Sequence, residues 1–154
     1  YSRVGRHLPG NSLKREKRTM QSMKKILFDS YAILCFYQDE KGADEVERLL
    51  VTSRQGEYRA FISEINLGEV HYKTVRRMGL HAAREQLEQF SELPIECVHP
   101  SSGIIVSASE LKAEHAISYA DCFALATALK THSSIVTGDP EFHKVKHLVE
   151  IMWI

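Results

Sequence analysis

ISYADCFALATAL, residues 117–129, is the stretch from which the rest of the chain is most readily interpreted. Asp121 is its sole formally charged residue. A helix that is apolar on nearly every face lies inside a protein, so the sequence predicts a buried helix here, capped by Ser118 and followed by Lys130 near its C-terminus. A buried carboxylate without a cation is costly. Asp121 is therefore either a surface residue on a less buried helix or a carboxylate that faces a bound metal ion.

The composition is that of an ordinary globular protein with one domain. The chain has 154 residues, of which 44% are hydrophobic and 26% charged, enough for one sizeable core. There is no signal-peptide core, and no apolar run approaches the roughly 20 residues of a membrane helix. Cys35, Cys97 and Cys122 lack C-x-x-C spacing, which predicts buried free thiols in a reducing compartment. We expect a cytoplasmic protein without membrane contact.

The formal net charge of zero hides an asymmetry. Residues 1–22 carry six Lys and Arg against one acid, which leaves 14 basic and 19 acidic side chains, a net charge of −5, in residues 23–154. We interpret 1–22 as an artificial leader, translated upstream sequence or disordered segment, with a basic tail that contacts nucleic acid as the alternative. The domain is assigned to 23–154. If this acidic body binds nucleic acid, a divalent metal ion would supply the positive charge that phosphates require.

Short apolar strands alternate with helices along the rest of the chain. The predicted strands are Lys25–Asp29, Arg59–Ile62, Ile95–Val98, Ser134–Thr137 and, at an edge, Glu150–Ile154. The predicted helices are Tyr31–Tyr37, Gly42–Arg54, Ser63–Arg77, Leu80–Leu93, Ile104–Ala116 and 117–129, with Ser30 as a possible cap of the first. This alternation indicates right-handed βαβ units. We expect a single α/β domain with a mainly parallel central sheet of about five strands flanked by helices.

Four carboxylates fall where such a sheet binds its ligands. Asp29 ends the first strand, Asp139 follows the fourth, Asp121 begins the buried helix, and Glu69 lies on the helix after the second strand. Ligands of open parallel sheets bind beyond the carboxyl ends of the strands, so these acids can converge there. Oxygen ligands of this kind suit Mg²⁺ or Mn²⁺ rather than zinc. The plainer alternatives are that Asp29 and Asp139 only cap helices and that Glu69 is solvated.

Two observations bear on the choice between metal binding and a purely structural role for these acids. Glu64 is the other acid of its helix, but in the first turn it would simply complement the helix dipole. Asp139 precedes Pro140, and this pair is typical of a helix start. Capping and metal binding are compatible roles for the same carboxylate.

Four motifs occur in order along residues 24–151: FDSYAIL at 28–34, SEINLGEVHY at 63–72, SYADCFALATAL at 118–129 and TGDPEF at 137–142. With them the chain resembles a PIN domain, and within that superfamily the VapC-type toxins of bacterial and archaeal toxin–antitoxin pairs. The resemblance implies that Asp29, Glu69, Asp121 and Asp139 chelate Mg²⁺ or Mn²⁺ for RNA cleavage by metal-activated water. It also implies that Asn66 helps to orient the site.

One residue departs from the family pattern. Tyr31 stands where a small polar residue is more usual, which puts in doubt a hydrogen bond near the metal but not the metal itself. The same Tyr31 argues against a haloacid-dehalogenase-like phosphatase, because that family has its second Asp at this position. The eight histidines form no zinc motif.

The resemblance implies a metal-dependent endoribonuclease, with RNA as its substrate, a small antitoxin protein as its partner, and a homodimer as its assembly. An antitoxin segment would enter the acidic groove and place an Arg near the acids. Val46, Leu50, Val70 and Tyr72 either line a groove for that partner or pack the core. A non-catalytic PIN-like RNA- or protein-binding module and a stand-alone RNA-processing nuclease are the alternatives.

Overall fold

Five strands form one sheet in the computed structural model, which describes residues 23–154. They are β1 (Lys24–Phe28), β2 (Tyr58–Ser63), β3 (Ile95–Val98), β4 (Ser134–Thr137) and β5 (Ile151–Trp153). The order is β3-β2-β1-β4-β5, and every neighbouring pair is parallel. The predicted five-stranded α/β fold is therefore confirmed, with a sheet that is wholly parallel. The interpretation of 1–22 as a leader lies outside the described residues.

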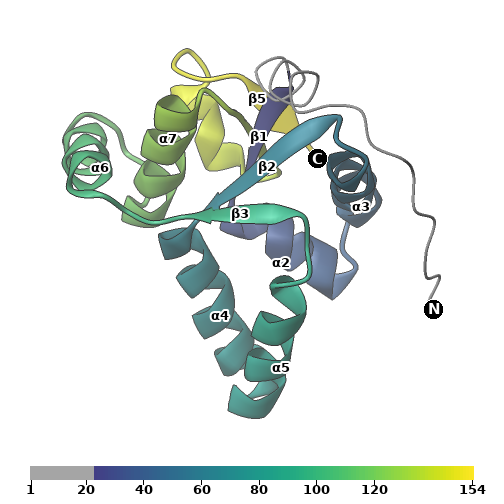
Figure 1. The fold of residues 1–154 in the computed structure, drawn as a ribbon. Coiled ribbons are helices and arrows are strands. Elements are labelled where there is room, and N and C mark those ends of the chain that lie inside the picture. The colour runs from purple at the N-terminus through teal and green to yellow at the C-terminus, as the bar shows by residue number, and fades with distance from the viewer. Residues whose placement is uncertain (1–22) are drawn as a thin grey trace.

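Helices cover both faces of the sheet (Figure 1). They are α2 (Ser30–Gln38), α3 (Ala43–Arg54), α4 (Glu64–Met78), α5 (Leu80–Phe90), α6 (Ser102–Glu114), α7 (Tyr119–Thr131) and the 3₁₀ helix η1 (Pro140–Val145). Leu27 of β1 packs with α6 and α7, whereas Ile26 and Phe28 pack with α2 and α3 on the other face. Because successive strand residues point to opposite faces and both faces are covered, the last three residues of β1, Ile26–Phe28, form a continuous apolar run.

The helix that the sequence predicts to be buried is buried. All eight residues from Asp121 to Ala128 lie in the interior, and only 7% of Asp121 is exposed. Ser118 caps this helix as predicted, accepting the backbone N–H of Asp121 at 3.1 Å. A carboxylate in this first turn is thus held inside the protein, which rules out a surface location.

Two smaller predictions are wrong. The cap of α2 is Asp29 rather than Ser30, since Asp29 Oδ1 accepts a backbone N–H three residues along at 2.9 Å. Cys35 and Cys122 are buried thiols as predicted, but Cys97 is exposed because it lies on the edge strand β3. Within residues 23–154 no helix combines the length and the apolar content needed to cross a bilayer.

The helix α4 links the two halves of the molecule at the carboxyl ends of the strands. It packs against both α2 and α7, and with α5 it forms a hairpin that extends away from the sheet (Figure 1). Of the four positions considered for a partner groove, Val46, Leu50 and Val70 are core residues, and Tyr72 alone is exposed. Amphipathic periodicity identified the apolar faces of these helices correctly, but neighbouring elements already cover most of them.

Candidate active site

The two acids at strand ends are held together by one hydroxyl group. β1 and β4 are parallel neighbours, so Asp29, directly after β1, lies beside the segment that leaves β4. Thr137 donates a hydrogen bond of 2.5 Å to Asp29 Oδ2, and its oxygen accepts the backbone N–H of Asp139 at 3.0 Å. Asp139 also caps η1 by accepting the N–H of Glu141 at 2.9 Å, as its position before a proline predicts.

Glu69 reaches the same place from α4. Its Oε1 accepts a short hydrogen bond from the hydroxyl of Ser30, the residue that follows Asp29. Lys73, one helical turn further along α4, places its Nζ 3.4 Å from the same oxygen. Glu69 and Asp139 line one open pocket beside the first turn of α2. The predicted approach of these acids to one another is thereby seen for three of the four carboxylates.

Asp121 arrives at the site on the first turn of α7. Asn66 of α4 is fully buried and donates from Nδ2 to the backbone carbonyl of Ala120 at 3.2 Å, which fixes α4 against the start of α7. The Oδ1 atom of Asn66 is buried and has no partner among the described residues. Asn66 therefore connects the helices that bear Glu69 and Asp121, while its role in orienting the site, which the resemblance implies, stays a prediction.

The carboxylates perturb one another electrostatically. The pKa of Asp29 is raised to about 7, chiefly by burial and also by the charges of Asp121 and Asp139, while its hydrogen bonds with Thr137 and Ala32 oppose the rise. Burial likewise raises the pKa of Asp121 to about 6, with further contributions from Asp139 and Glu69. The ion pairs within residues 23–154 include neither Asp29 nor Asp121. Among the described residues, Lys73 is therefore a cation paired with Glu69, while the two buried acids Asp29 and Asp121 have no ion-pair partner.

The donor set fits a hard divalent ion, although the side chains do not form a ready cage. In residues 23–154, no three His, Cys, Asp or Glu side chains come close enough together to hold a metal. Glu69 Oε1 accepts two hydrogen bonds, whereas both oxygens of Asp29 and Oδ1 of Asp139 each accept one and keep a second lone pair. Carboxylate oxygens are the ligands that Mg²⁺ and Mn²⁺ prefer. Metal binding by Asp29, Glu69, Asp121 and Asp139 stays a prediction.

Sequence reasoning missed the hydroxyl groups that position these acids. Thr137 was predicted only as the last residue of a strand, and Ser30 only as a possible cap. Thr137 reaches Asp29 across 108 positions of sequence, because β1 pairs with β4. The pairing of these strands, rather than any local pattern, is the signal that identifies it.

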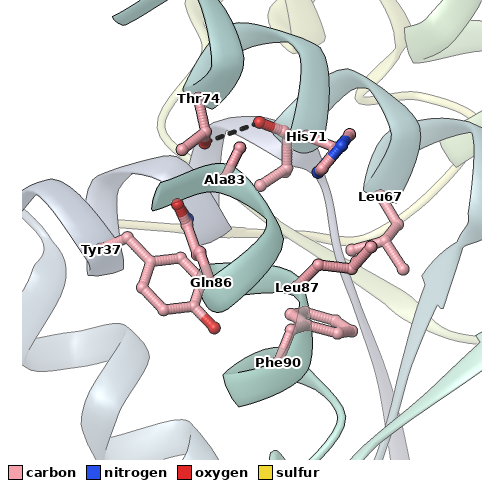
Figure 2. Close-up of a pocket in the computed structure, with 9 residues that line it drawn as sticks. Tyr37, Leu67, His71, Thr74, Ala83, Gln86, Leu87 and Phe90 are labelled. Atoms are coloured by element: carbon pink, nitrogen blue, oxygen red, sulfur yellow. Dashed lines mark hydrogen bonds between the residues drawn. The ribbon is translucent and has the colours of Figure 1, made fainter. Parts of the chain in front are cut away.

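A second pocket lies away from the acids, between α2 and the α4–α5 hairpin (Figure 2). Its empty volume is about 210 Å³, and no acid lines it. Three side-chain atoms at this pocket are buried and have no hydrogen-bond partner within residues 23–154: Tyr37 Oη, His71 Nδ1 and Gln86 Nε2. Burial raises the pKa of Tyr37 to about 12. The described residues that line this pocket include no Asp or Glu, so it is separate from the four acids.

Comparison with known proteins agrees with this fold. The PIN domain family model matches residues 26–148. No curated protein sequence matches the chain. Several solved structures do match, at 14–20% sequence identity, so the likeness concerns the fold.

Three of these structures illustrate the likeness. VapBC2 from Rickettsia felis, bound to a promoter DNA fragment, has a TM-score of 0.65 and 18% identity over 83% of this chain and 97% of its own. DNA-bound VapBC from Salmonella typhimurium has a TM-score of 0.65 and 19% identity over 84% and 98%. VapC20 from Mycobacterium tuberculosis, described as a sarcin-ricin loop cleaving toxin, has a TM-score of 0.63 and 17% identity over 78% and 94%.

Proposed function

The chain belongs to the PIN domain family, and from that premise we propose that it is a metal-dependent endoribonuclease, the VapC-type toxin of a toxin–antitoxin pair. The observation that carries the proposal is the placement of four carboxylates from four segments at the carboxyl ends of a parallel sheet, where Thr137 links Asp29 to Asp139 and where Glu69 and Asp139 line one pocket. The solved structures of similar fold, which include VapBC complexes and an RNA-loop-cleaving toxin, support the same function.

In this proposal Asp29, Glu69, Asp121 and Asp139 hold Mg²⁺ or Mn²⁺. A bound ion would supply Lewis acidity, which lowers the pKa of a water molecule and offsets charge on the phosphodiester as it is cut. Thr137 fixes the positions of Asp29 and Asp139 relative to each other through its two hydrogen bonds. Metal ligands depend on such supporting hydrogen bonds for their orientation. Because a nearby cation favours the charged form of a carboxylate, binding would release the protons that the raised pKa values of the two buried acids retain.

Cleavage of RNA tests the proposal. Wild-type protein should cut single-stranded and structured RNA in Mg²⁺ or Mn²⁺, stop in EDTA, and leave 5′-phosphate products. Asp121→Asn should reduce the rate by about 100-fold or more, the scale of losing one electrostatic group in an active site. Asp44→Asn is the matched control, because Asp44 is an exposed acid in the first turn of α3.

Three outcomes contradict the proposal. Cleavage that survives EDTA, or an Asp121→Asn rate equal to wild type, would exclude the metal mechanism. RNA binding without any cleavage would instead favour the non-catalytic binding module.

The partners follow from the same proposal. We expect a small antitoxin that covers the acidic site in the cytoplasm, and a homodimer of the toxin. The exposed apolar side chains available to either partner include Tyr72 and Met78 on α4, Leu80 on α5, and Val106 on α6. Co-expression with a neighbouring small gene should give a stable complex with suppressed ribonuclease activity. A chain that is harmless, monomeric at high concentration and free of co-purifying protein would favour the stand-alone RNA-processing nuclease.

A further inference from the structure

The pocket that Glu69 and Asp139 share extends beyond the acids over the first two turns of α2. It is open to solvent and has an empty volume of about 480 Å³. Two side chains at its wall are of types that bind nucleotides, Tyr31 from α2 and Lys73 from α4. Since the pocket adjoins two of the predicted metal ligands, a group bound in it would lie next to the bond that is cut.

Tyr31 presents an exposed ring on a fixed support. The residue is 41% exposed, yet its ring lies against the backbone of Gly138. A Cβ atom added to Gly138 would overlap the ring, with Cδ1 and Cζ of Tyr31 only 3.1 Å away. The absence of a side chain at Gly138 is therefore what lets the ring settle beside Asp139. Exposed aromatic rings held in one position are the surfaces on which unpaired bases stack.

Lys73 supplies the positive charge of this pocket. It is the sole Lys or Arg among the described residues that line the pocket, and its side chain is 46% exposed. Its ammonium group is 3.4 Å from Glu69 Oε1, so the charge is kept near the acids rather than directed into solvent. An exposed pair of this kind is weak, and a lysine can exchange it for a phosphate at little cost.

We propose that Tyr31 and Lys73 form a subsite for one nucleotide of a single-stranded RNA, directly beside the scissile phosphate. Tyr31 stacks on the base and Lys73 binds a phosphate of the same nucleotide. The inference rests on the proposed ribonuclease function and extends it, because it assigns base contact to a residue at which this chain departs from the usual family pattern. The subsite explains how an acidic body binds an anionic strand at its metal centre.

Binding measurements on the inactive protein test the subsite. Asp121→Asn is titrated in Mg²⁺ with a short, fluorescently labelled single-stranded RNA that contains a site cleaved by the wild type, and anisotropy is recorded. Adding Tyr31→Ser or Tyr31→Leu should weaken binding between about 5-fold and 100-fold, the range for losing one stacked base, whereas Tyr31→Phe should bind as before. Tyr72→Ser is the matched control, since Tyr72 is 46% exposed on α4 and outside the pocket.

The contribution of Lys73 is tested by the salt dependence of RNA binding. Lys73→Met should weaken binding and reduce the slope of log affinity against log salt by about 0.7, the value for one phosphate contact on a single strand. Lys130→Met should leave the slope unchanged, because Lys130 is exposed at the opposite end of α7 from Asp121. An unchanged slope for Lys73→Met would show that the lysine only pairs with Glu69.

An abasic RNA separates stacking from a structural role of the ring. Removing the base next to the cleavage site should weaken binding to Asp121→Asn as much as Tyr31→Ser does, and should have no further effect once Tyr31 is replaced. Additive losses, or unchanged binding by Tyr31→Ser and Tyr31→Leu, would overturn the subsite. If wild-type protein cleaves RNA while the Tyr31 variants bind RNA normally, the subsite proposal is wrong and the proposed ribonuclease function stands. If the wild type neither binds nor cleaves RNA, both the subsite and the proposed ribonuclease function are wrong.

Discussion

The hydroxyl of Thr137 lies 2.5 Å from the buried Oδ2 of Asp29 and donates a hydrogen bond to it, while its oxygen accepts the backbone N–H of Asp139. One side chain thus ties the acid of β1 to the acid that follows β4. Thr137→Val keeps the shape of the side chain but leaves both partners without this contact. We expect a loss of about 1–3 kcal/mol in the free energy of unfolding, the usual cost of an unpaired buried polar group.

The loss caused by Thr137→Val should depend on pH. A hydrogen bond to an ionised carboxylate is stronger than one to a neutral acid, and the pKa of Asp29 is about 7. Urea unfolding should therefore show a larger loss at pH 8 than at pH 5. Thr74→Val is the control, because the buried hydroxyl of Thr74 donates to the carbonyl of Val70 and its loss should not vary with pH. An equal loss at both pH values would mean that Asp29 has the same charge at each.

The metal-free protein should become less stable as pH rises towards neutrality. Burial raises the pKa of Asp29 to about 7 and that of Asp121 to about 6, from an ordinary value of 3.8. Between the unfolded and folded values the folded state binds more protons, so the free energy of unfolding falls as pH rises and levels off above pH 7. Urea titrations in EDTA should show this fall, and Asp29→Asn or Asp121→Asn should flatten it. Asp44→Asn should leave it unchanged; a wild-type profile that rises from pH 5 to 7 would contradict the assignment.

Much of this fold is predictable because local sequence and final packing agree. The strands Ile95–Val98 and Ser134–Thr137 were predicted with their observed bounds, since Pro94 and Gly138 limit short apolar runs. α6 was placed two residues late, because Ser101 caps it by accepting the N–H of Ile104 at 3.3 Å. A pattern of apolar residues does not reveal a cap made by a polar serine.

The candidate site was predictable only in part, because some of its contacts join residues that are far apart in the sequence. Its four acids stand at strand ends and helix starts, which sequence patterns locate. The hydrogen bond from Thr137 to Asp29 and the packing of Tyr31 on Gly138 require strand pairing, which no local pattern encodes. Of the two alternatives for Val46 and Val70, a partner groove or the core, the core is the one observed, because other elements cover their apolar side chains.

Divalent metal should stabilise the wild-type protein and not the Asp121→Asn variant. Binding to the folded state alone adds about 2.7 kcal/mol when the free ion is at about 100 times its dissociation constant, which corresponds to roughly 5–10 °C in melting temperature. In EDTA, Asp121→Asn should melt at or above the wild-type temperature, because it removes a buried carboxylate that neighbouring acids repel. Melting curves with Mn²⁺ and with EDTA measure both effects. A large fall for Asp121→Asn in EDTA would instead show that Asp121 makes a structural hydrogen bond.

A side chain at Gly138 should destabilise the protein while Tyr31 is present. The added methyl group of Gly138→Ala would overlap the Tyr31 ring, and overpacking of this kind costs about 1–3 kcal/mol. Tyr31→Ser in the same chain should recover most of that loss, because it vacates the space. Gly68→Ala is the control, since a Cβ on Gly68 meets no atom within 4 Å and the helix should gain about 0.5–1 kcal/mol. If the two substitutions are additive in thermal or urea unfolding, the ring is not held against Gly138.

Gln86 should be replaceable with a gain in stability. Its Nε2 atom is buried in the pocket between α2 and the α4–α5 hairpin, with no partner among the described residues (Figure 2). Leu67, Leu87 and Phe90 make that lining largely apolar. Gln86→Leu removes the amide that this setting desolvates, and we expect the free energy of unfolding to rise by about 1 kcal/mol.

Gln89→Leu is the comparison for this last change, because Gln89 lies on the exposed rim of the same hairpin and should give little effect. Urea unfolding measures both variants, and RNA cleavage by Gln86→Leu should equal that of the wild type because no acid lines this pocket. A loss of stability in Gln86→Leu would mean that a buried water satisfies the amide in solution. A loss of cleavage with unchanged stability would mean that the packing of α5 against α4 controls the position of Glu69.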